Sequence, residues 1–126
     1  MNIRPDAFLR QCPSRDVLAH IGEKWSLLVL NALADGPVRF GDLRRRIEGI
    51  SQKMLTQTLR RLERDGLVRR RVFDERPLRV DYDLTARGRE LLPLTQALKG
   101  WAERHTKGIE TSNAAFDRKQ GVSTLV

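Results

Sequence analysis

Apolar residues recur at helical spacing from the start of the chain. Val17, Leu18 and Ile21 follow Ser14, which can cap a short helix, and Gly22 suits the C-terminal end of that helix. The next segment, WSLLVLNALADGP, is apolar around most of its circumference and stops at Asp-Gly-Pro. We therefore predict a short helix followed by a central core helix.

A brief basic helix is predicted next. Residues 38–39 allow only a minimal strand, and RFGDLRRRIEG then places Leu43 and Ile47 on one side. The three consecutive arginines at positions 44–46 fall largely on the outer side. We expect this helix to be short, with its apolar side on the core.

The segment ISQKMLTQTLRRLERDGLV, residues 50–68, has the best-defined ends. Ser51 is a favoured N-cap residue, and Gly66 suits the left-handed position after the last turn. Leu55, Leu59 and Leu62 fall within an arc of about 60° around the helix, which predicts a buried face. Around the opposite pole lie Lys53, Gln57, Arg60 and Arg64.

Strict alternation marks a strand near residue 80. Val80, Tyr82 and Leu84 alternate with Asp81 and Asp83, and residues 67–73 supply a partner across a turn at 74–78. In such a hairpin the arginines at 69–71 lie near the two aspartates, so some basic charge is expected to form cross-strand pairs.

A last helix is predicted after Thr85, a suitable cap. Pro93 interrupts it and predicts a kink or a restart. From residue 106 to 126 the chain is polar, with Ile109, Phe116 and the last few residues as anchors, so we expect disorder unless this tail docks. The helix carries a short heptad seam made of Leu91, Leu94, Leu98, Trp101 and His105.

Charge favours a polyanionic partner. The 126 residues suit one domain, and the net charge is +8 with a sequence pI of about 10.7. Residues 39–79 hold thirteen Lys and Arg against six Asp and Glu. Nucleic acid is the leading interpretation, and an anionic membrane surface is the alternative.

Cysteine content and hydropathy favour the cytoplasm. The chain has one cysteine, which excludes an intramolecular disulfide and fits a reducing compartment. Its start lacks the apolar run of a signal peptide, and no segment approaches the roughly 20 apolar residues of a membrane span. Because CxxC, HExxH and a glycine-rich phosphate loop are absent from the sequence, we expect no metal and no cofactor.

The order of elements predicts a helix-turn-helix. A brief helix, a turn at residues 48–50 and a longer capped helix have the spacing of that motif, and the basic hairpin adds a wing. The exposed face of the longer helix is rich in amides and hydroxyls, which suit hydrogen bonds to base edges. An ordinary solvated amphipathic helix is the alternative.

The motifs IGEKW, RFGDL, GISQKMLTQTLRRLERDGLV and YDLTARG, in this order, resemble those of the HxlR-type winged helix-turn-helix transcriptional regulators, which are relatives of the MarR group. The resemblance covers about residues 12–101. It implies an α+β fold, mainly α, with a two-stranded wing and terminal dimerisation helices. It also implies a homodimer that binds double-stranded DNA at an operator, with a DNA-binding core at about 12–88 and dimerisation through the N-terminal segment and about 89–105.

Site residues are carried over by position. The resemblance implies that six residues read bases in the major groove: Ser51, Gln52, Lys53, Thr56, Gln57 and Arg60. We expect Arg39, Arg44 and Arg45 to contact DNA phosphates. Arg46 is interpreted as a surface residue without a DNA contact. Arg76, at the wing tip, is expected to contact the minor groove or a phosphate; a solvated turn arginine is the alternative. Dimerisation is assigned to Leu91, Leu94, Leu98 and Trp101, which otherwise would belong to an intramolecular core.

Cys12 is the candidate sensor. Several HxlR-type proteins sense oxidants or electrophiles through an N-terminal cysteine, and QCPSRD matches that location. Arg10, Arg15 and the helix N-terminus are expected to lower the thiol pKa. With no second cysteine, oxidation would link subunits or capture a small thiol. The alternative is that Cys12 is a small buried apolar residue without a sensing role.

Rival functions follow from the same residues. A non-specific architectural winged helix that binds DNA or RNA is the first alternative, and a small enzyme using Cys12 and His20 is the second. We expect His20 to flank a helix and His105 to be exposed at a helix end. Trp25 and Tyr82 are expected to be core residues.

Overall fold

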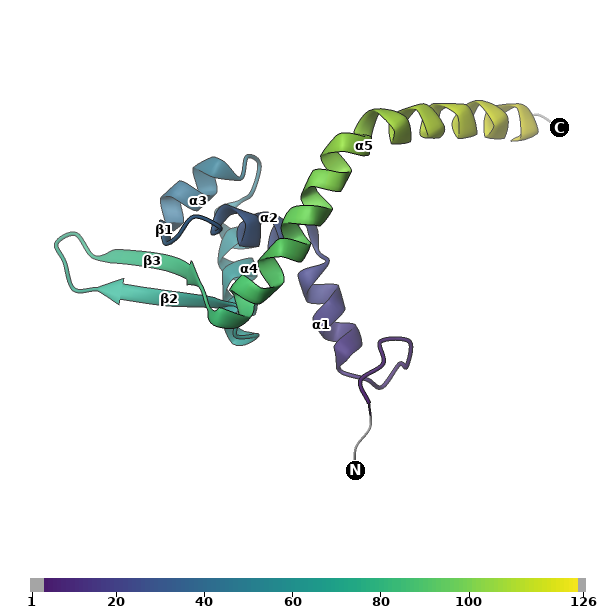
Figure 1. The fold of residues 1–126 in the computed structure, drawn as a ribbon. Coiled ribbons are helices and arrows are strands. Elements are labelled where there is room, and N and C mark those ends of the chain that lie inside the picture. The colour runs from purple at the N-terminus through teal and green to yellow at the C-terminus, as the bar shows by residue number, and fades with distance from the viewer. Residues whose placement is uncertain (1–3, 125–126) are drawn as a thin grey trace. The chain divides into compact units, whose positions relative to one another are not determined.

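The computed structural model describes residues 4–124, with side chains up to residue 121. The chain divides into two compact units between Thr95 and Gln96. The elements, shown in Figure 1, are α1 (Ser14–Ile21), α2 (Lys24–Ala32), β1 (Val38–Arg39), α3 (Phe40–Arg46), α4 (Gln52–Arg64), β2 (Val68–Phe73), β3 (Arg79–Leu84) and α5 (Ala86–Thr124).

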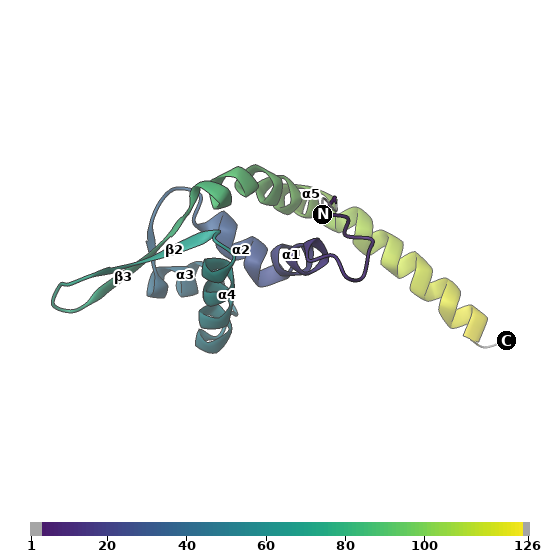
Figure 2. The same ribbon diagram turned by 90° about the horizontal axis from the view of Figure 1, so that it is seen from below.

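A small antiparallel sheet forms the wing. Its three strands have the order β1-β3-β2, and the two-residue strand β1 pairs Val38 with Tyr82. In the hairpin, Arg70 pairs with the same Tyr82 and Arg69 with Asp83. Figure 2 shows β2 and β3 extending as a ribbon past α3 and α4. The minimal strand, the wing and the mainly helical fold that the pattern predicts are confirmed.

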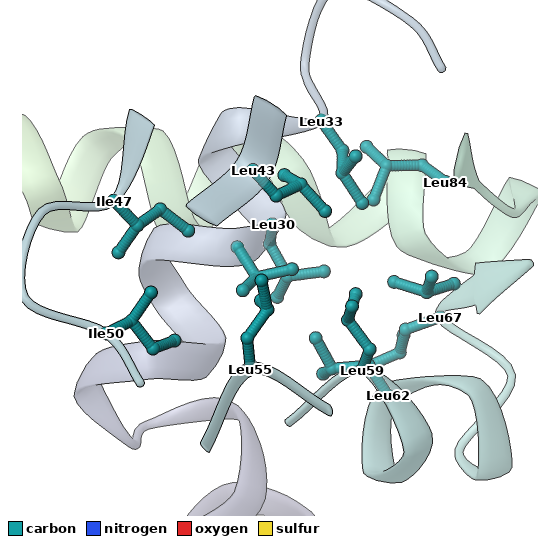
Figure 3. Packing of buried hydrophobic residues seen from close by; sticks show 12 residues of the cluster. Leu30, Leu33, Leu43, Ile47, Ile50, Leu55, Leu59, Leu62, Leu67 and Leu84 are labelled. Atoms are coloured by element: carbon teal, nitrogen blue, oxygen red, sulfur yellow. The ribbon is translucent and has the colours of Figure 1, made fainter. Parts of the chain in front are cut away.

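Buried leucines and isoleucines tie the helices to the root of the wing. Helix α2 packs against α1, α3 and α4. The side chains point into one interior in Figure 3, which confirms α2 as a central member of the core. The buried apolar set is Val29, Leu30, Leu33, Leu43, Ile47, Ile50, Leu55, Leu59, Leu62, Leu67, Val68 and Leu84.

Both ends of α4 follow the expected local chemistry. The Ser51 hydroxyl accepts a hydrogen bond from the Met54 backbone N–H over 3.0 Å, which satisfies one donor of the first turn. At the other end Gly66 has φ +75°, and the Leu67 N–H donates to the Leu62 carbonyl over 2.9 Å. This is the bond pattern of a Schellman motif. The sequence signals therefore placed α4 correctly.

Helix α1 differs from its prediction at its N-terminal end. Pro13, not Ser14, occupies the N-cap position, and no side chain caps the helix. The Ser14 hydroxyl instead lies 3.0 Å from the Cys12 Sγ atom. Gly22 is the C-cap residue of α1, as expected, and has an ordinary helical φ of −84°. The expected Ser14 cap is wrong because the neighbouring thiol engages the hydroxyl.

Helix α5 starts as predicted and runs further than predicted. Thr85 Oγ1 accepts from the Gly88 N–H over 3.1 Å, and the helix continues through Pro93 to Thr124. A restart at Pro93 and a disordered tail are therefore wrong. One proline removes one ladder bond, and the residues beyond it allow local pairs such as Lys99 with Glu103, at 2.7 Å.

The tail anchors Ile109 and Phe116 are exposed. The last few residues were also expected to act as anchors, but the side chains of positions 122–126 lie outside the described part of the structure. Within residues 4–124, even α5 is not apolar enough to form a membrane span.

Candidate nucleic-acid interface

The outer face of α4 carries polar side chains over a buried apolar back. Leu55, Leu59 and Leu62 are almost fully buried, which fixes the rotation of the helix. The opposite side is therefore turned outward, as its spacing predicts. Of the six residues assigned to the major groove, Thr56 is half-buried and the others are exposed: Ser51, Gln52, Lys53, Gln57 and Arg60.

One edge of this face borders a groove of about 530 Å³ between α4 and the sheet. The sheet contributes Arg70 and Tyr82, which are paired across β2 and β3 and so point to one side. Sequence reasoning missed these two side chains, although the hairpin register could have placed them together. The groove is lined by Phe40, Gln52, Thr56, Leu59, Arg60, Glu63, Arg70, Val80 and Tyr82.

The lining divides the candidate residues into two groups. Gln52, Thr56 and Arg60 follow one another at intervals of four and line the groove. Lys53 and Gln57 are exposed but belong to the outer edge of α4. If a DNA double helix contacts α4, its bases would face the outer edge of the helix. One of its sugar-phosphate strands would face the groove.

Arginines at α3 add a second basic surface. Arg39 directly precedes the helix, and the last turn contains Arg44, Arg45 and Arg46, all exposed. One guanidinium nitrogen of Arg45 contacts the Asp42 carboxylate within the same helix. Among the described residues, Arg44 makes no ion pair. The positive charge of Arg44 is therefore more available than that of Arg45.

In the wing, some arginines form internal ion pairs. Arg79 lies 3.2 Å from Glu75 and 3.5 Å from Asp81, and its guanidinium carbon is 3.9 Å from the centre of the Phe73 ring. Asp81 thus pairs with Arg79 rather than with Arg71, its neighbour in the ladder. Arg76, at the tip, is exposed.

Asp83 joins the wing to α5. Its buried carboxylate accepts from Arg69 of β2 over 3.3 Å and from Arg89 of α5 over 3.1 Å. The Leu84 backbone N–H donates to the same carboxylate over 2.9 Å. The expected cross-strand pairing is confirmed at Arg69, and Asp83 holds the root of the wing against the start of the last helix.

Cys12 is part of a folded N-terminal hook. Its Sγ atom accepts from the Asp6 N–H over 3.2 Å and lies beside the Ser14 hydroxyl. The Ser14 side-chain and backbone hydrogen bonds, followed by that of Asp6, lower the thiol pKa. Arg15 instead donates to the carbonyls of Ala7 and Phe8 over 3.0 and 2.7 Å. The direction of the pKa shift is as predicted, but the arginines are not its cause.

His105 is exposed, as expected, but other surroundings of the two histidines were not predicted. His20 Nδ1 lies 3.1 Å from the Asp65 carboxylate, so it connects α1 to the end of α4. His105 lies inside α5, not at its end, and stacks on Trp101 with ring centres 4.2 Å apart. Cys12 and His20 thus have separate partners. Within residues 4–124, no cluster of three His, Cys, Asp or Glu could hold a metal ion.

The residues assigned to dimerisation fall into two groups. Leu91 is half-buried and packs against the core of its own chain. Leu94, Leu98 and Trp101 are exposed, at 68%, 50% and 48%. The alternative of an intramolecular core therefore describes Leu91, whereas the other three present apolar surface to solvent.

The partly buried aromatics Trp25 and Tyr82 pack against the core, as expected.

Comparison with known proteins gives matches along most of the chain. A family model described as HxlR-like helix-turn-helix matches residues 20–110. The HTH-type transcriptional regulator YtfH of Escherichia coli is 46% identical over 96 residues, which cover 76% of each chain. The solved structure of ytfH from Salmonella typhimurium has a TM-score of 0.83 at 40% identity and covers 88% of this chain and 99% of its own. The redox regulator HypR, in its oxidized form, has a TM-score of 0.69 at 42% identity and covers 74% and 96%.

Proposed function

The chain belongs to the HxlR-like family of helix-turn-helix transcriptional regulators, and we propose that it binds a specific inverted-repeat operator as a homodimer. The observation that carries this proposal is the outer face of α4, whose polar side chains are backed by Leu55, Leu59 and Leu62. A helix anchored in this way presents its polar face in a fixed orientation. The proposed activity is binding rather than catalysis, since Cys12 and His20 have separate partners.

Base recognition falls to the outer edge of α4. Gln57 can form two hydrogen bonds to adenine, and Lys53 can donate to guanine in the major groove. Ser51 lies at the N-terminus of α4, whose free N–H groups favour a phosphate. In the groove, Arg60 and Arg70 supply positive charge for the adjoining sugar-phosphate strand.

Phosphate contacts outside α4 fix the register. Arg39 and Arg44 lie on or beside α3, and Arg76 lies at the tip of the wing. Arg45 can serve the same role through the guanidinium nitrogens that do not contact Asp42. Such contacts raise affinity for every sequence and make it depend on salt.

Two copies are required for an inverted repeat. The exposed Leu94, Leu98 and Trp101 supply apolar surface for the second copy, together with Phe8 and Leu9 of the N-terminal hook. Two α4 helices about 34 Å apart would then enter successive major grooves on one face of the duplex. This spacing is the one that an operator with two half-sites requires.

Selection from a random duplex library tests the proposal. We expect enrichment of one symmetric site, bound at least about a thousandfold more tightly than random duplex. A non-specific architectural protein, binding DNA or RNA, would instead bind all duplexes alike with a steep salt dependence. Enrichment without sequence preference would refute the proposed function.

Redox control through Cys12 is the second part of the proposal. The lowered thiol pKa raises the reactive thiolate fraction, and HypR, which shares this fold, is a redox regulator. Oxidation of Cys12, by linking subunits or capturing a small thiol, would change operator affinity. A band-shift assay with diamide tests this: Cys12→Ser should be unaffected, and an equal response of both proteins would disprove sensing by this thiol.

A further inference from the structure

The second compact unit of the chain carries an apolar stripe that the fold leaves exposed. This unit begins at Gln96 and, in its described part, consists of helix α5. At 100° per residue, six side chains between positions 98 and 116 fall within an arc of about 80°. Four of them are large, apolar and at least 44% exposed: Leu98, Trp101, Ile109 and Phe116. We call these four, with His105 and Ser112 between them, the α5 stripe.

The opposite side of the same helix segment is charged. Lys99 and Glu103 form an ion pair at 2.7 Å, which supports the helix from that side. Large apolar side chains on one face and charges on the other are typical of a helix that packs against an apolar partner. The charged, exposed side chains away from the stripe are Lys99, Glu103, Lys107, Glu110 and Asp117.

The α5 stripe is symmetric about His105. Trp101 and Ile109 each lie four positions from this residue. Leu98 and Ser112 each lie seven positions from it. A two-fold axis makes residue i of one copy meet residue j of the other copy, and the reverse. Two antiparallel copies aligned at His105 would therefore place Trp101 against Ile109. They would also place Leu98 against Ser112.

Side-chain size favours antiparallel over parallel pairing. Parallel copies in register would place each side chain against its own copy. Two Trp101 rings would then crowd each other, while two Ser112 side chains would leave a gap, and both faults cost packing energy. In the antiparallel register the indole meets a smaller aliphatic side chain and the serine meets a leucine. Facing large and small side chains fill an interface in this way.

The charges beside the stripe allow the antiparallel arrangement. Lys99 lies six positions before His105 and Glu110 five positions after it, on the same side of the stripe. Antiparallel copies therefore bring these opposite charges near each other. Arg104 lies next to the axis, but an added Cβ at Gly100 would lie 3.1 Å from one of its guanidinium nitrogens, so this group lies over Gly100. Two such groups would be about 15 Å apart along the pair, beyond the Debye length of about 8 Å.

We propose that the α5 stripe is a contact surface for a second copy of this chain, antiparallel and centred on His105. The inference rests on the homodimer of the proposed function. It adds Ile109 and Phe116, which lie beyond the dimerisation segment that the sequence predicts at about 89–105. By the same count Phe116 comes opposite Leu94 of the second copy, another exposed apolar residue.

The area of the stripe indicates how much of the dimer it can form. The four large apolar side chains of each copy are about half exposed, so a pair would bury roughly 800 Å². Specific protein interfaces bury at least about 1,200 Å² in total. The stripe therefore extends a dimer contact that also includes Leu94, and it should strengthen association without being its whole basis.

Cysteine cross-linking in the full-length Cys12→Ser protein tests the register. His105→Cys should link two copies under mild oxidation with diamide, because the two thiols lie at the same level. Leu98→Cys and Ser112→Cys should each fail alone, since each position is about 21 Å along the helices from its own copy. The double variant Leu98→Cys/Ser112→Cys should link, and only between chains, because the two positions are also about 21 Å apart within one helix. Lys107→Cys, close to the axis but on the charged side, is the matched control and should not link.

Three cross-linking outcomes would overturn the inference. Linking of Leu98→Cys and Ser112→Cys each to its own copy would show parallel pairing. Failure of His105→Cys to link would remove the stripe from the interface. Linking of Lys107→Cys as readily as His105→Cys would make the reaction a product of random collision.

Sedimentation equilibrium tests the energetic contribution without any new thiol. Ile109→Lys should raise the dissociation constant of the homodimer about ten- to hundredfold, because a charge would replace a buried apolar side chain. Thr111→Lys, an exchange for the same residue outside the stripe, should change it less than about twofold. Equal dissociation constants for the two variants would overturn the inference.

The inference and the proposed function can fail separately. Selection of a symmetric operator by a protein whose His105→Cys variant does not link would overturn the inference alone. Selection without sequence preference would refute the proposed function, while linking through position 105 would persist.

Discussion

The hydroxyl of Ser51 accepts a hydrogen bond from the backbone N–H of Met54 over 3.0 Å. This bond closes the first turn of α4 at the end where the proposed operator contacts begin. Substitution of Ser51 therefore has two separable effects, on the stability of the helix and on the charge next to DNA.

Ser51→Ala should lower the free energy of unfolding by about 1 kcal/mol, because the first turn loses its cap. Ser51→Asp should retain stability, since a carboxylate also caps the helix, but should weaken operator binding by repelling phosphate. Chemical denaturation and a band-shift assay measure the two effects. Unchanged DNA binding by Ser51→Asp would show that this end of α4 faces away from the duplex.

Gln57→Ala should relax base preference and cost about 1–3 kcal/mol of binding free energy on the correct site. Gln57 is exposed on the outer edge of α4, so the free energy of unfolding should stay within about 0.5 kcal/mol of the parent. Competition between the selected duplex and single-base variants provides the measurement. Equal losses on all sequences would assign Gln57 to the backbone instead.

Arg44→Ala should weaken binding to all sequences alike and reduce the slope of log affinity against log salt by about one. Arg44 makes no ion pair among the described residues, so no internal contact is broken. Arg46→Ala is the control, since Arg46 is an exposed arginine of the same turn that is assigned no DNA contact. Identical slopes for the two variants would contradict the assignment.

Gly49→Ala should destabilise the protein by about 1 kcal/mol. Gly49 has φ +88°, and an added Cβ would meet nothing within 4 Å, so the cost comes from the backbone alone. Gly49→Asn should cost less, because asparagine tolerates the left-handed region better. Denaturation curves of both variants test this, and equal costs would exclude backbone strain as the cause.

Ser14→Ala should slow alkylation of Cys12 by iodoacetamide at neutral pH. The Ser14 hydrogen bond is the largest cause of the lowered thiol pKa, so its removal raises the pKa and reduces the thiolate fraction. The rates should converge at about pH 10, where both thiols are ionised. Ser14→Thr keeps a hydroxyl and should react more nearly like the parent; a rate equal to that of Ser14→Ala would contradict this cause.

Leu98→Lys should dissociate the proposed homodimer without unfolding the chain, because Leu98 is 50% exposed. Val72→Lys is the matched control: it exchanges an equally exposed apolar side chain for lysine in the wing. Sedimentation equilibrium measures the association of both. A Leu98→Lys variant that associates like the parent would move the dimer contact elsewhere.

Local signals predicted most of the fold. Ser51 and Gly66 mark the ends of α4 through bonds to residues a few positions away, and the alternation around Tyr82 sets the wing. These features depend on neighbours in the sequence, and a pattern reveals them directly. The exposed face of α4 followed from the burial of its leucines.

The features that sequence reasoning missed include one that depends on tertiary packing and two that are local. His20 and Asp65 are 45 positions apart, and no local pattern brings an imidazole to the end of another helix. The contact of Arg45 with Asp42 is a local pair that the run of arginines obscured. The helical tail was missed because a polar composition was taken as disorder, although its neighbouring side chains support a helix.

Asp83 has one carboxylate and receives Arg69 from β2 and Arg89 from α5. Because both arginines bind the same carboxylate, the hairpin root and the first turns of α5 should move together. A force applied to the beginning of α5 would then reach the hairpin root together with the core, to which Leu84 and Leu91 both contribute.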